Sequence, residues 1–149
     1  MGLFNRKPQN DTSEISSEIT AFPIEYNGEN LWAKALDSDC GIWFEDDGAT
    51  IYFYATDASY SEIYDALWIF NKQDPDALKP GEKIFVVWNP ERKLAGLFFR
   101  DKFHAIFNFR AKCGYCRSGF PADSGTDWSP EGHMWNESLV QLFYPTPKK

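Results

Sequence analysis

The sequence is poor in the residues that most often form metal centres and disulfide frameworks. It contains three cysteines and two histidines among 149 residues, and an odd number of thiols cannot pair completely. It has no apolar run near the roughly 20 residues that a membrane helix needs, and no apolar core of signal-peptide length near its start. The few cysteines and the lack of long apolar segments predict a cytoplasmic protein with no disulfide framework and no membrane contact.

Basic residues are also scarce, with 15 lysines and arginines against 22 acidic residues and a net charge of −7. This balance argues against a nucleic-acid partner. The charge is unevenly spread, because residues 25–86 carry thirteen acids and four bases, whereas residues 91–117 carry seven bases and two acids. We interpret the two blocks as solvated or mutually neutralising faces. A basic face that meets an anionic partner or ligand is the alternative.

Apolar side chains are plentiful, since hydrophobic residues make up 43% and aromatic residues 17% of the chain. Such a composition can offset the entropy lost on folding, and the length suits one domain. The first part of the chain is polar and has few core-forming side chains. We therefore predict a disordered arm over residues 1–20 and a single domain over residues 21–149. Pro23 restricts any strand near the start of that domain to an edge strand, or places the proline at the beginning of the strand.

Strands are predicted in two places. Residues 41–57 read as two strands around Asp47 and Gly48, because Asp-Gly between two apolar-aromatic runs is a strong hairpin signal. Residues 82–111 contain three apolar runs separated by short turns, which predicts an antiparallel meander. In its last run, alternate phenylalanine and alanine side chains are expected in the core, while the face with His104 and Arg110 is free for solvent or a ligand.

The segment between these strands has a helical period. Ile63, Ala66, Leu67 and Phe70 are spaced i, i+3, i+4 and i+7, which places them on one face of a helix over Ser61–Asn71. The expected fold class is therefore α+β. It has an antiparallel sheet of about five or six strands, one main helix on one face of the sheet, and a long C-terminal loop.

That loop is predicted over residues 111–135, which contain two prolines and four glycines. A loop of this length is either functional or mobile. Trp128 and Trp135 are interpreted as anchors that pack it onto the core. Residues 135–145 close the chain as a short helix or a final strand, and the pattern leaves this choice open.

Cys113 and Cys116 have the C-x-x-C spacing that is typical of zinc sites and of thiol–disulfide chemistry. A structural zinc site needs four ligands, and only Cys40, His104 and His133 remain, none of them at zinc-finger spacing. No helix is predicted after the pair, so the dipole that activates such thiols is lacking. We predict semi-buried thiols with no metal, no cofactor and no obligatory disulfide. A redox role stays open.

Several segments, "FEDDG", "HAIFNF" and "GYCR" followed by "FP", are similar to those of small bacterial proteins grouped as a domain of unknown function, over about residues 40–121. The resemblance implies a compact α+β domain and brings no known activity. It draws attention to a linked group after the last meander strand: His104, Tyr115, Cys116, Arg117, Phe120 and Pro121.

The function predicted from these patterns is a non-enzymatic intracellular binding protein with a protein partner, for example a toxin that it neutralises. The charge split and the aromatic strands with polar faces favour this interpretation. The alternative is an enzyme or small-ligand-binding domain whose site lies at the last meander strand and the loop over 111–135. The candidate lining of that site is His104, Arg110, Tyr115, Cys116, Arg117 and His133.

Overall fold

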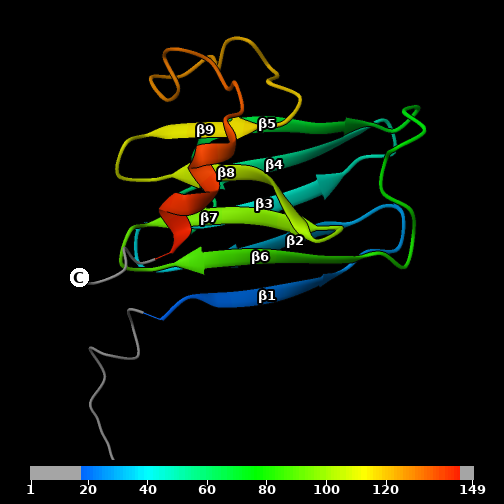
Figure 1. Ribbon diagram of the computed structural model, residues 1–149, viewed down its shortest axis with the longest axis horizontal. Coiled ribbons are helices and arrows are strands. Elements are labelled where there is room, and N and C mark those ends of the chain that lie inside the picture. The colour runs from blue at the N-terminus through cyan, green and yellow to red at the C-terminus, as the bar shows by residue number, and fades with distance from the viewer. Residues whose placement is uncertain (1–17, 145–149) are drawn as a thin grey trace, which may run out of the picture.

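The computed structural model describes residues 18–144, which form nine strands and one short 3-10 helix, η1 (Figure 1). Most of the predicted N-terminal arm, residues 1–17, lies outside the described residues. Among residues 18–144, no helix has the length and apolar character needed to cross a membrane. The elements are β1 (Thr20–Glu25), β2 (Leu31–Ala35), β3 (Gly41–Asp46), β4 (Thr50–Thr56), β5 (Ile63–Asn71), β6 (Lys83–Asn89), β7 (Leu94–Phe99), β8 (Lys102–Asn108), β9 (Cys113–Cys116) and η1 (Glu137–Phe143).

The strands form two antiparallel sheets that stack face to face as a sandwich (Figure 1). One sheet has five strands in the order β1-β6-β7-β8-β9, and the other has four in the order β2-β3-β4-β5. The sheets approach each other along one side, where β5 contacts β8 and β9. Pro23 lies in β1, which is an edge strand as predicted, because proline has no N–H to donate to a central ladder.

The predicted α+β fold is wrong, because the segment expected to be the main helix is strand β5. This strand pairs with β4 along its length. Its Leu67 and Ile69 point into the core while Trp68 points outward, which is the alternation of a half-buried strand. The alternation is hard to see in the sequence because the preceding inward position holds a charged residue, Asp65, which is only 1% exposed.

The predicted hairpin is confirmed as β3 and β4. Asp46 Oδ1 accepts a hydrogen bond from the Gly48 backbone N–H at 2.9 Å, and Asp47 Oδ1 accepts from the N–H groups of Ala49 and Thr50. Gly48 has φ of +91°, in the left-handed region that favours glycine. The acidic residues of this stretch therefore build the turn.

The predicted meander is confirmed as β6, β7 and β8, and the core lies between it and the other sheet. Phe53 of β4 stacks on Phe107 of β8 with ring centroids 5.2 Å apart. The β7–β8 ladder shifts register near Phe98, and His104 turns inward, where its ring stacks on Phe99 at 3.6 Å. On the side of β8 that was expected to be polar and open, His104 and Ile106 are therefore buried, whereas Asn108 is half-buried and Arg110, after the strand, is exposed.

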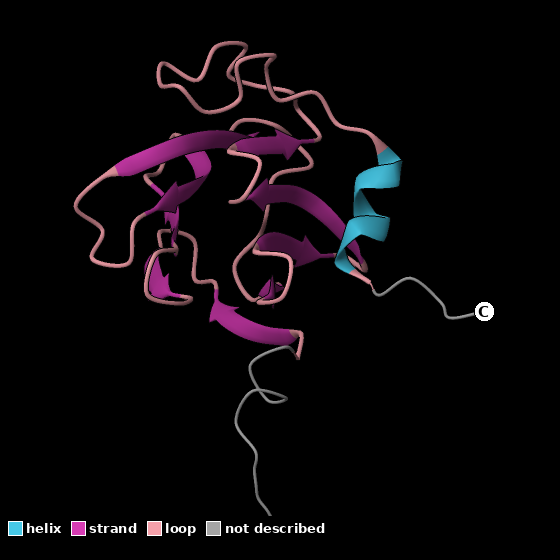
Figure 2. Cartoon of the chain, turned by 90° about the vertical axis from the view of Figure 1, so that its left-hand side faces the viewer, coloured by secondary structure: helices cyan, strands magenta, loops and turns pink. Residues whose placement is uncertain are grey.

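The segment 137–143, near the end of the described residues, is the helix η1, which lies across the outer face of the five-stranded sheet (Figures 1 and 2). Asn136 caps it, because its side chain accepts a hydrogen bond from the Ser138 backbone N–H. Phe143 is fully buried and stacks on Phe103 at 4.6 Å. The predicted loop over 111–135 is irregular apart from β9, and Trp128 anchors it as expected, since this side chain is 4% exposed.

Candidate functional site

The outer face of the four-stranded sheet carries a continuous row of aromatic rings. Neighbouring ring centroids lie between 5.5 and 6.4 Å apart. Two of these side chains, Trp68 and Phe120, are 44% and 53% exposed. Isolated exposed apolar residues are ordinary, whereas adjoining ones mark interaction sites. We call this row the aromatic face, and its residues are Trp43, Tyr54, Tyr52, Trp68 and Phe120.

Strand register explains why these rings meet. Side chains alternate between the two faces of a strand, so Tyr52 and Tyr54 point outward while the residues between them point into the core. Trp43 lies opposite Tyr54 in the β3–β4 ladder. Tyr52 lies opposite Trp68 in the β4–β5 ladder. Cross-strand neighbours of this kind are in side-chain contact, and the four rings therefore join into one surface.

One acidic side chain, that of Glu45, lies among the rings of the aromatic face. Glu45 lies opposite Tyr52 and accepts a hydrogen bond from the Tyr54 hydroxyl at 2.9 Å. Burial, followed by this bond to a carboxylate, raises the pKa of Tyr54, so its phenol stays neutral. The whole sheet falls within residues 25–86, the part of the chain with thirteen acids and four bases.

A hollow of about 350 Å³ opens on this face beside Trp68. We call it the Trp68 hollow. Three rings of the aromatic face contribute to its walls, and a hydroxyl, an amide and a carboxylate contribute polar atoms. These residues are Tyr52, Trp68 and Phe120, together with Thr50, Asn71 and Asp74, and Ile69, Phe70 and Ser118 complete the lining.

Phe120 reaches the aromatic face from the loop after β9, and hydrogen bonds to β5 hold this loop in place. The Trp68 backbone N–H donates to the Phe120 carbonyl at 3.0 Å. The Ser118 hydroxyl donates to the Trp68 carbonyl at 2.6 Å. Further along, the Thr126 hydroxyl donates to the Tyr64 carbonyl at 2.7 Å. The loop thus covers the edge of β5, where unpaired backbone groups are otherwise exposed.

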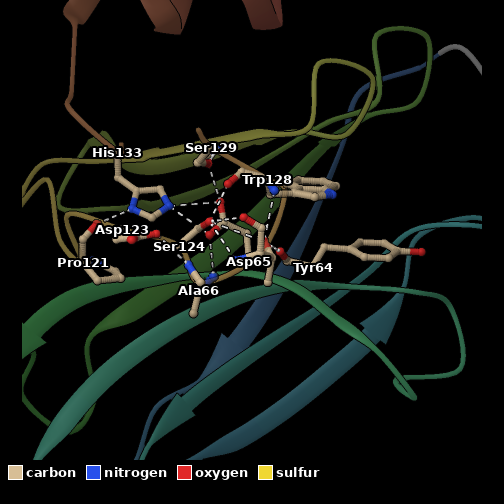
Figure 3. Close-up of polar contacts among 12 residues, drawn as sticks. Tyr64, Asp65, Ala66, Pro121, Asp123, Ser124, Trp128, Ser129 and His133 are labelled. Carbon is tan, nitrogen blue, oxygen red and sulfur yellow. Dashed lines mark hydrogen bonds and ion pairs between the residues drawn. The ribbon is translucent and has the colours of Figure 1, made fainter. Parts of the chain in front are cut away.

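A buried polar cluster also holds the loop after β9 in place (Figure 3). The Ser129 hydroxyl donates to Asp65 Oδ2 at 2.6 Å and accepts from the Gly114 backbone N–H at 2.8 Å. The Nε2 atom of His133 lies 2.9 Å from Asp65 Oδ1, and its Nδ1 atom faces the Pro121 carbonyl. Both side chains of this ion pair are completely buried.

The surroundings of His133 favour its positively charged form. The Pro121 carbonyl can only accept a hydrogen bond, and so can an ionised Asp65 carboxylate, so each N–H of a charged ring has an acceptor. Burial lowers the pKa of His133, but the hydrogen bonds to Asp65 and Pro121 outweigh it, and the pKa is raised above its ordinary value. The buried charges of Asp65 and His133 thus compensate each other.

This cluster has the residue types of a hydrolytic triad but not the geometry. The Ser129 hydroxyl donates to the carboxylate of Asp65 rather than to an imidazole nitrogen, so His133 is not placed to take its proton. Both nitrogens of His133 already donate elsewhere. All three side chains are buried. The cluster is therefore a structural anchor that ties residues 121–133 to β5.

Of the six residues predicted to line a site, the structure brings His104 and Arg117 together. They line a second hollow, of about 530 Å³, with Arg100 and Lys102. Burial, followed by the positive charge of Arg117, lowers the pKa of His104 to about 4, so its ring is neutral at pH 7. Arg117 donates to Glu137 at 2.7 Å, which offsets part of the positive charge there.

The other four predicted residues are dispersed. Arg110 lines a separate hollow at the far end of β8, and Tyr115 is half-buried on β9. Cys116 is buried, and its thiol faces the Phe120 carbonyl at 3.4 Å. His133 belongs to the buried cluster. The six side chains therefore do not converge on one cavity.

The C-x-x-C pair lies within β9, where a spacing of three residues points Cys113 and Cys116 to opposite faces of the strand. The Cys113 thiol donates to the Ala111 carbonyl at 3.4 Å. Burial raises the pKa of Cys116, which opposes thiolate formation. Within the described part of the chain, no three His, Cys, Asp or Glu side chains are grouped to hold a metal ion.

Sequence reasoning missed the aromatic face and the partners of His133. Part of the signal was present, because Tyr52 and Tyr54 alternate with core residues in a segment predicted as a strand. Trp68 was assigned to a helix, so it was not grouped with these tyrosines. The pairing of Asp65 with Ser129 and His133 joins residues more than 60 positions apart, and no local pattern signals it.

The chain matches the model of a protein family described as "Uncharacterized protein conserved in bacteria (DUF2251)" over residues 27–144. It is also similar to an uncharacterized protein of Haemophilus influenzae, with 31% identity over 93 residues. That alignment covers 60% of this chain and 58% of the relative, so the chain spans somewhat more than half of that protein's length. No solved structure matches this chain.

Proposed function

The chain belongs to the DUF2251 family of bacterial proteins, and we propose that it is a non-catalytic binding protein that binds a cationic protein through its aromatic face. The observation that carries the proposal is the continuous row of five aromatic side chains on an outer sheet face. Trp and Tyr are enriched at the centres of protein interfaces and supply much of their binding energy. A rigid sheet presents such rings with little loss of entropy on binding.

The charge around the aromatic face supports a partner of positive charge. The sheet that bears it lies in the acid-rich part of the chain, with thirteen acids over residues 25–86. Glu45 lies among the rings themselves. Complementary potentials speed association and suppress wrong partners. A cationic surface therefore fits this face better than an acidic or neutral one.

A comparison of two exposed aromatic positions tests the proposal. The wild-type protein, the Trp68→Ala variant and the Tyr144→Ala variant are used to capture proteins from the bacterium that encodes the chain. Tyr144 is the control because it is 52% exposed and lies beyond η1, away from the aromatic face. We expect one basic protein to bind the wild type and Tyr144→Ala in a defined ratio, to bind Trp68→Ala at least about tenfold more weakly, and to dissociate as salt rises.

Three outcomes would overturn the proposal. The first is equal capture by Trp68→Ala and Tyr144→Ala, which would place any interface elsewhere. The second is a partner whose binding is insensitive to salt. The third is a glycan rather than a protein on this face, because aromatic sheet faces also suit sugar rings.

A toxin that acts on nucleic acid is the specific partner that this proposal favours, because such an enzyme must itself present a cationic surface to phosphates. The cytoplasm is the proposed location, in line with a short chain that has few cysteines. Co-expression with the product of the neighbouring gene tests whether the partner is a toxin, and cell fractionation tests the cytoplasmic location. Recovery of the chain outside the cytoplasmic fraction would contradict the location.

A further inference from the structure

Resting on the proposed function, we propose that the Trp68 hollow is a pocket for an arginine side chain of the partner. The hollow measures about 350 Å³, which lies at the lower end of the range for ligand-binding pockets, roughly 300–1,000 Å³. It opens within the aromatic face rather than beside it, because Tyr52, Trp68 and Phe120 belong to both. A side chain that enters it therefore contacts the part of the aromatic face formed by Tyr52, Trp68 and Phe120.

The walls suit a planar cation. Trp68 lies between the other two rings, with centroid distances of 6.4 Å to Tyr52 and 6.2 Å to Phe120. The faces of aromatic rings attract cations, and tryptophan does so most strongly. A guanidinium group also stacks on such rings through its own flat surface, which an ammonium group cannot do. The walls therefore favour arginine over lysine.

The polar lining supplies the acceptors that a guanidinium group needs. Among the described residues that line the hollow, Asp74 alone is charged, and it also borders the second hollow with Arg100 and Arg117. One of its carboxylate oxygens accepts from the Asp76 backbone N–H at 2.9 Å, and the other makes no hydrogen bond within the described part of the chain. Thr50 adds a hydroxyl oxygen. A carboxylate beside aromatic walls is a site for a charge-assisted bond to arginine.

The cations of the neighbouring hollow do not exclude this occupant. Arg100 is held by Glu82 through bonds of 2.7 and 2.8 Å, and Arg117 is held by Glu137 at 2.7 Å. Both arginines line the second hollow and not the Trp68 hollow. Their paired carboxylates offset part of their charge. Lys102 also lines the second hollow and not the Trp68 hollow, so Asp74 is the charged side chain that a cation meets there.

A titration with small probes tests the pocket on the wild-type protein alone. Isotope-labelled protein is titrated with N-acetyl-arginine amide and, separately, with N-acetyl-citrulline amide, which has the same shape but no charge. We expect saturable NMR shifts of the Trp68 indole and the Asn71 side chain with the arginine probe. The citrulline probe should bind at least about tenfold more weakly, because it lacks the cation. Equal binding of both probes, or shifts centred on other residues, would overturn the pocket.

The Asp74→Asn variant then separates this inference from the proposed function. It should lose about tenfold in affinity for the arginine probe and for the captured partner, whereas Asp39→Asn, an exposed acid on the β2–β3 connection, should lose neither. If Trp68→Ala abolishes partner capture and Asp74→Asn does not affect it, the arginine pocket is wrong and the binding face stands. If neither variant affects capture, the proposed function itself is wrong.

Discussion

The two outer faces of the sandwich are both apolar, but within residues 18–144 only one of them is covered by another segment of the protein. On the five-stranded sheet, η1 buries Phe143 against Phe103 and closes the face. On the four-stranded sheet, the rings around Trp68 adjoin each other at 5.5 and 6.4 Å but stay partly open. The C-terminal segment thus completes the fold on one side.

We propose that the difference between the two faces separates a structural role from a binding role. Burying a large aromatic side chain contributes on the order of 2–3 kcal/mol to folding, and a half-exposed ring contributes less. A row of rings that gives up part of this stabilisation is best explained by an interaction with another molecule. The covered face should therefore determine stability, and the aromatic face should determine binding.

Removing the ring that closes the covered face should have the largest effect on stability. Phe143 is fully buried and stacks on Phe103, so Phe143→Ala creates a cavity and should lower the free energy of unfolding by about 3–5 kcal/mol. Urea denaturation measures this loss, and Tyr144→Ala is the control, expected within about 0.5 kcal/mol of wild type. Equal losses for the two variants would show that η1 does not stabilise the face beneath it.

Breaking the buried Asp65–His133 pair should lower the free energy of unfolding nearly as much. His133→Ala leaves the carboxylate of Asp65 buried without its charged partner, and such changes cost about 3–5 kcal/mol. The double variant Asp65→Asn/His133→Ala should be more stable than His133→Ala, because the unpaired charge is removed. Urea denaturation of both variants checks this, and the reverse order would contradict a charged pair.

The stability contributed by the two histidines should also depend on pH in opposite directions. His133 has a raised pKa, so the stability that it supplies is complete below the ordinary histidine pKa and is lost as pH rises through its folded value. His104 has its pKa lowered to about 4, so its contribution is complete above about pH 6.5 and is lost as pH falls towards 4, by at most about 3 kcal/mol. Unfolding curves of wild type and His104→Gln between pH 4 and 7 should diverge. Parallel curves would contradict the lowered pKa.

Removing a ring from the aromatic face should have the smallest effect on stability. Trp68 is 44% exposed, so Trp68→Ala should change the free energy of unfolding by less than about 1 kcal/mol while it weakens partner capture. Thermal or urea unfolding checks the first expectation. A loss above about 3 kcal/mol would mean that Trp68 is a core residue, and the contrast between the two faces would fail.

Turns and the meander were predictable because their signals are local. Asp47 and Gly48 specify the hairpin with side-chain acceptors and a positive φ, and the β6–β8 runs are bounded by short turns. The segment 63–71 was not predictable in this way, because its apolar spacing fits a helix as well as a strand. Pairing with β4 decides between them, and this is a contact that sequence periodicity does not contain.

The candidate site was less predictable than the fold. Two of its rings, Tyr52 and Tyr54, fall on the outward positions of a predicted strand, but Phe120 joins them only through the loop that the Asp65–His133 pair holds. His104 and Arg117 were predicted to be near each other and do share a hollow. Arg110, Tyr115 and Cys116 do not join them, because strand alternation and the distance along the sheet separate these side chains.

Hydrogen exchange of the complex with the captured partner tests the central claim most directly. The backbone amides of β3, β4, β5 and the loop around Phe120 should be protected when the partner binds, while those of η1 and β7 should exchange as in the free protein. Protection confined to η1 and the five-stranded sheet would show that the partner binds the other side of the sandwich, and the aromatic face would lose its proposed role.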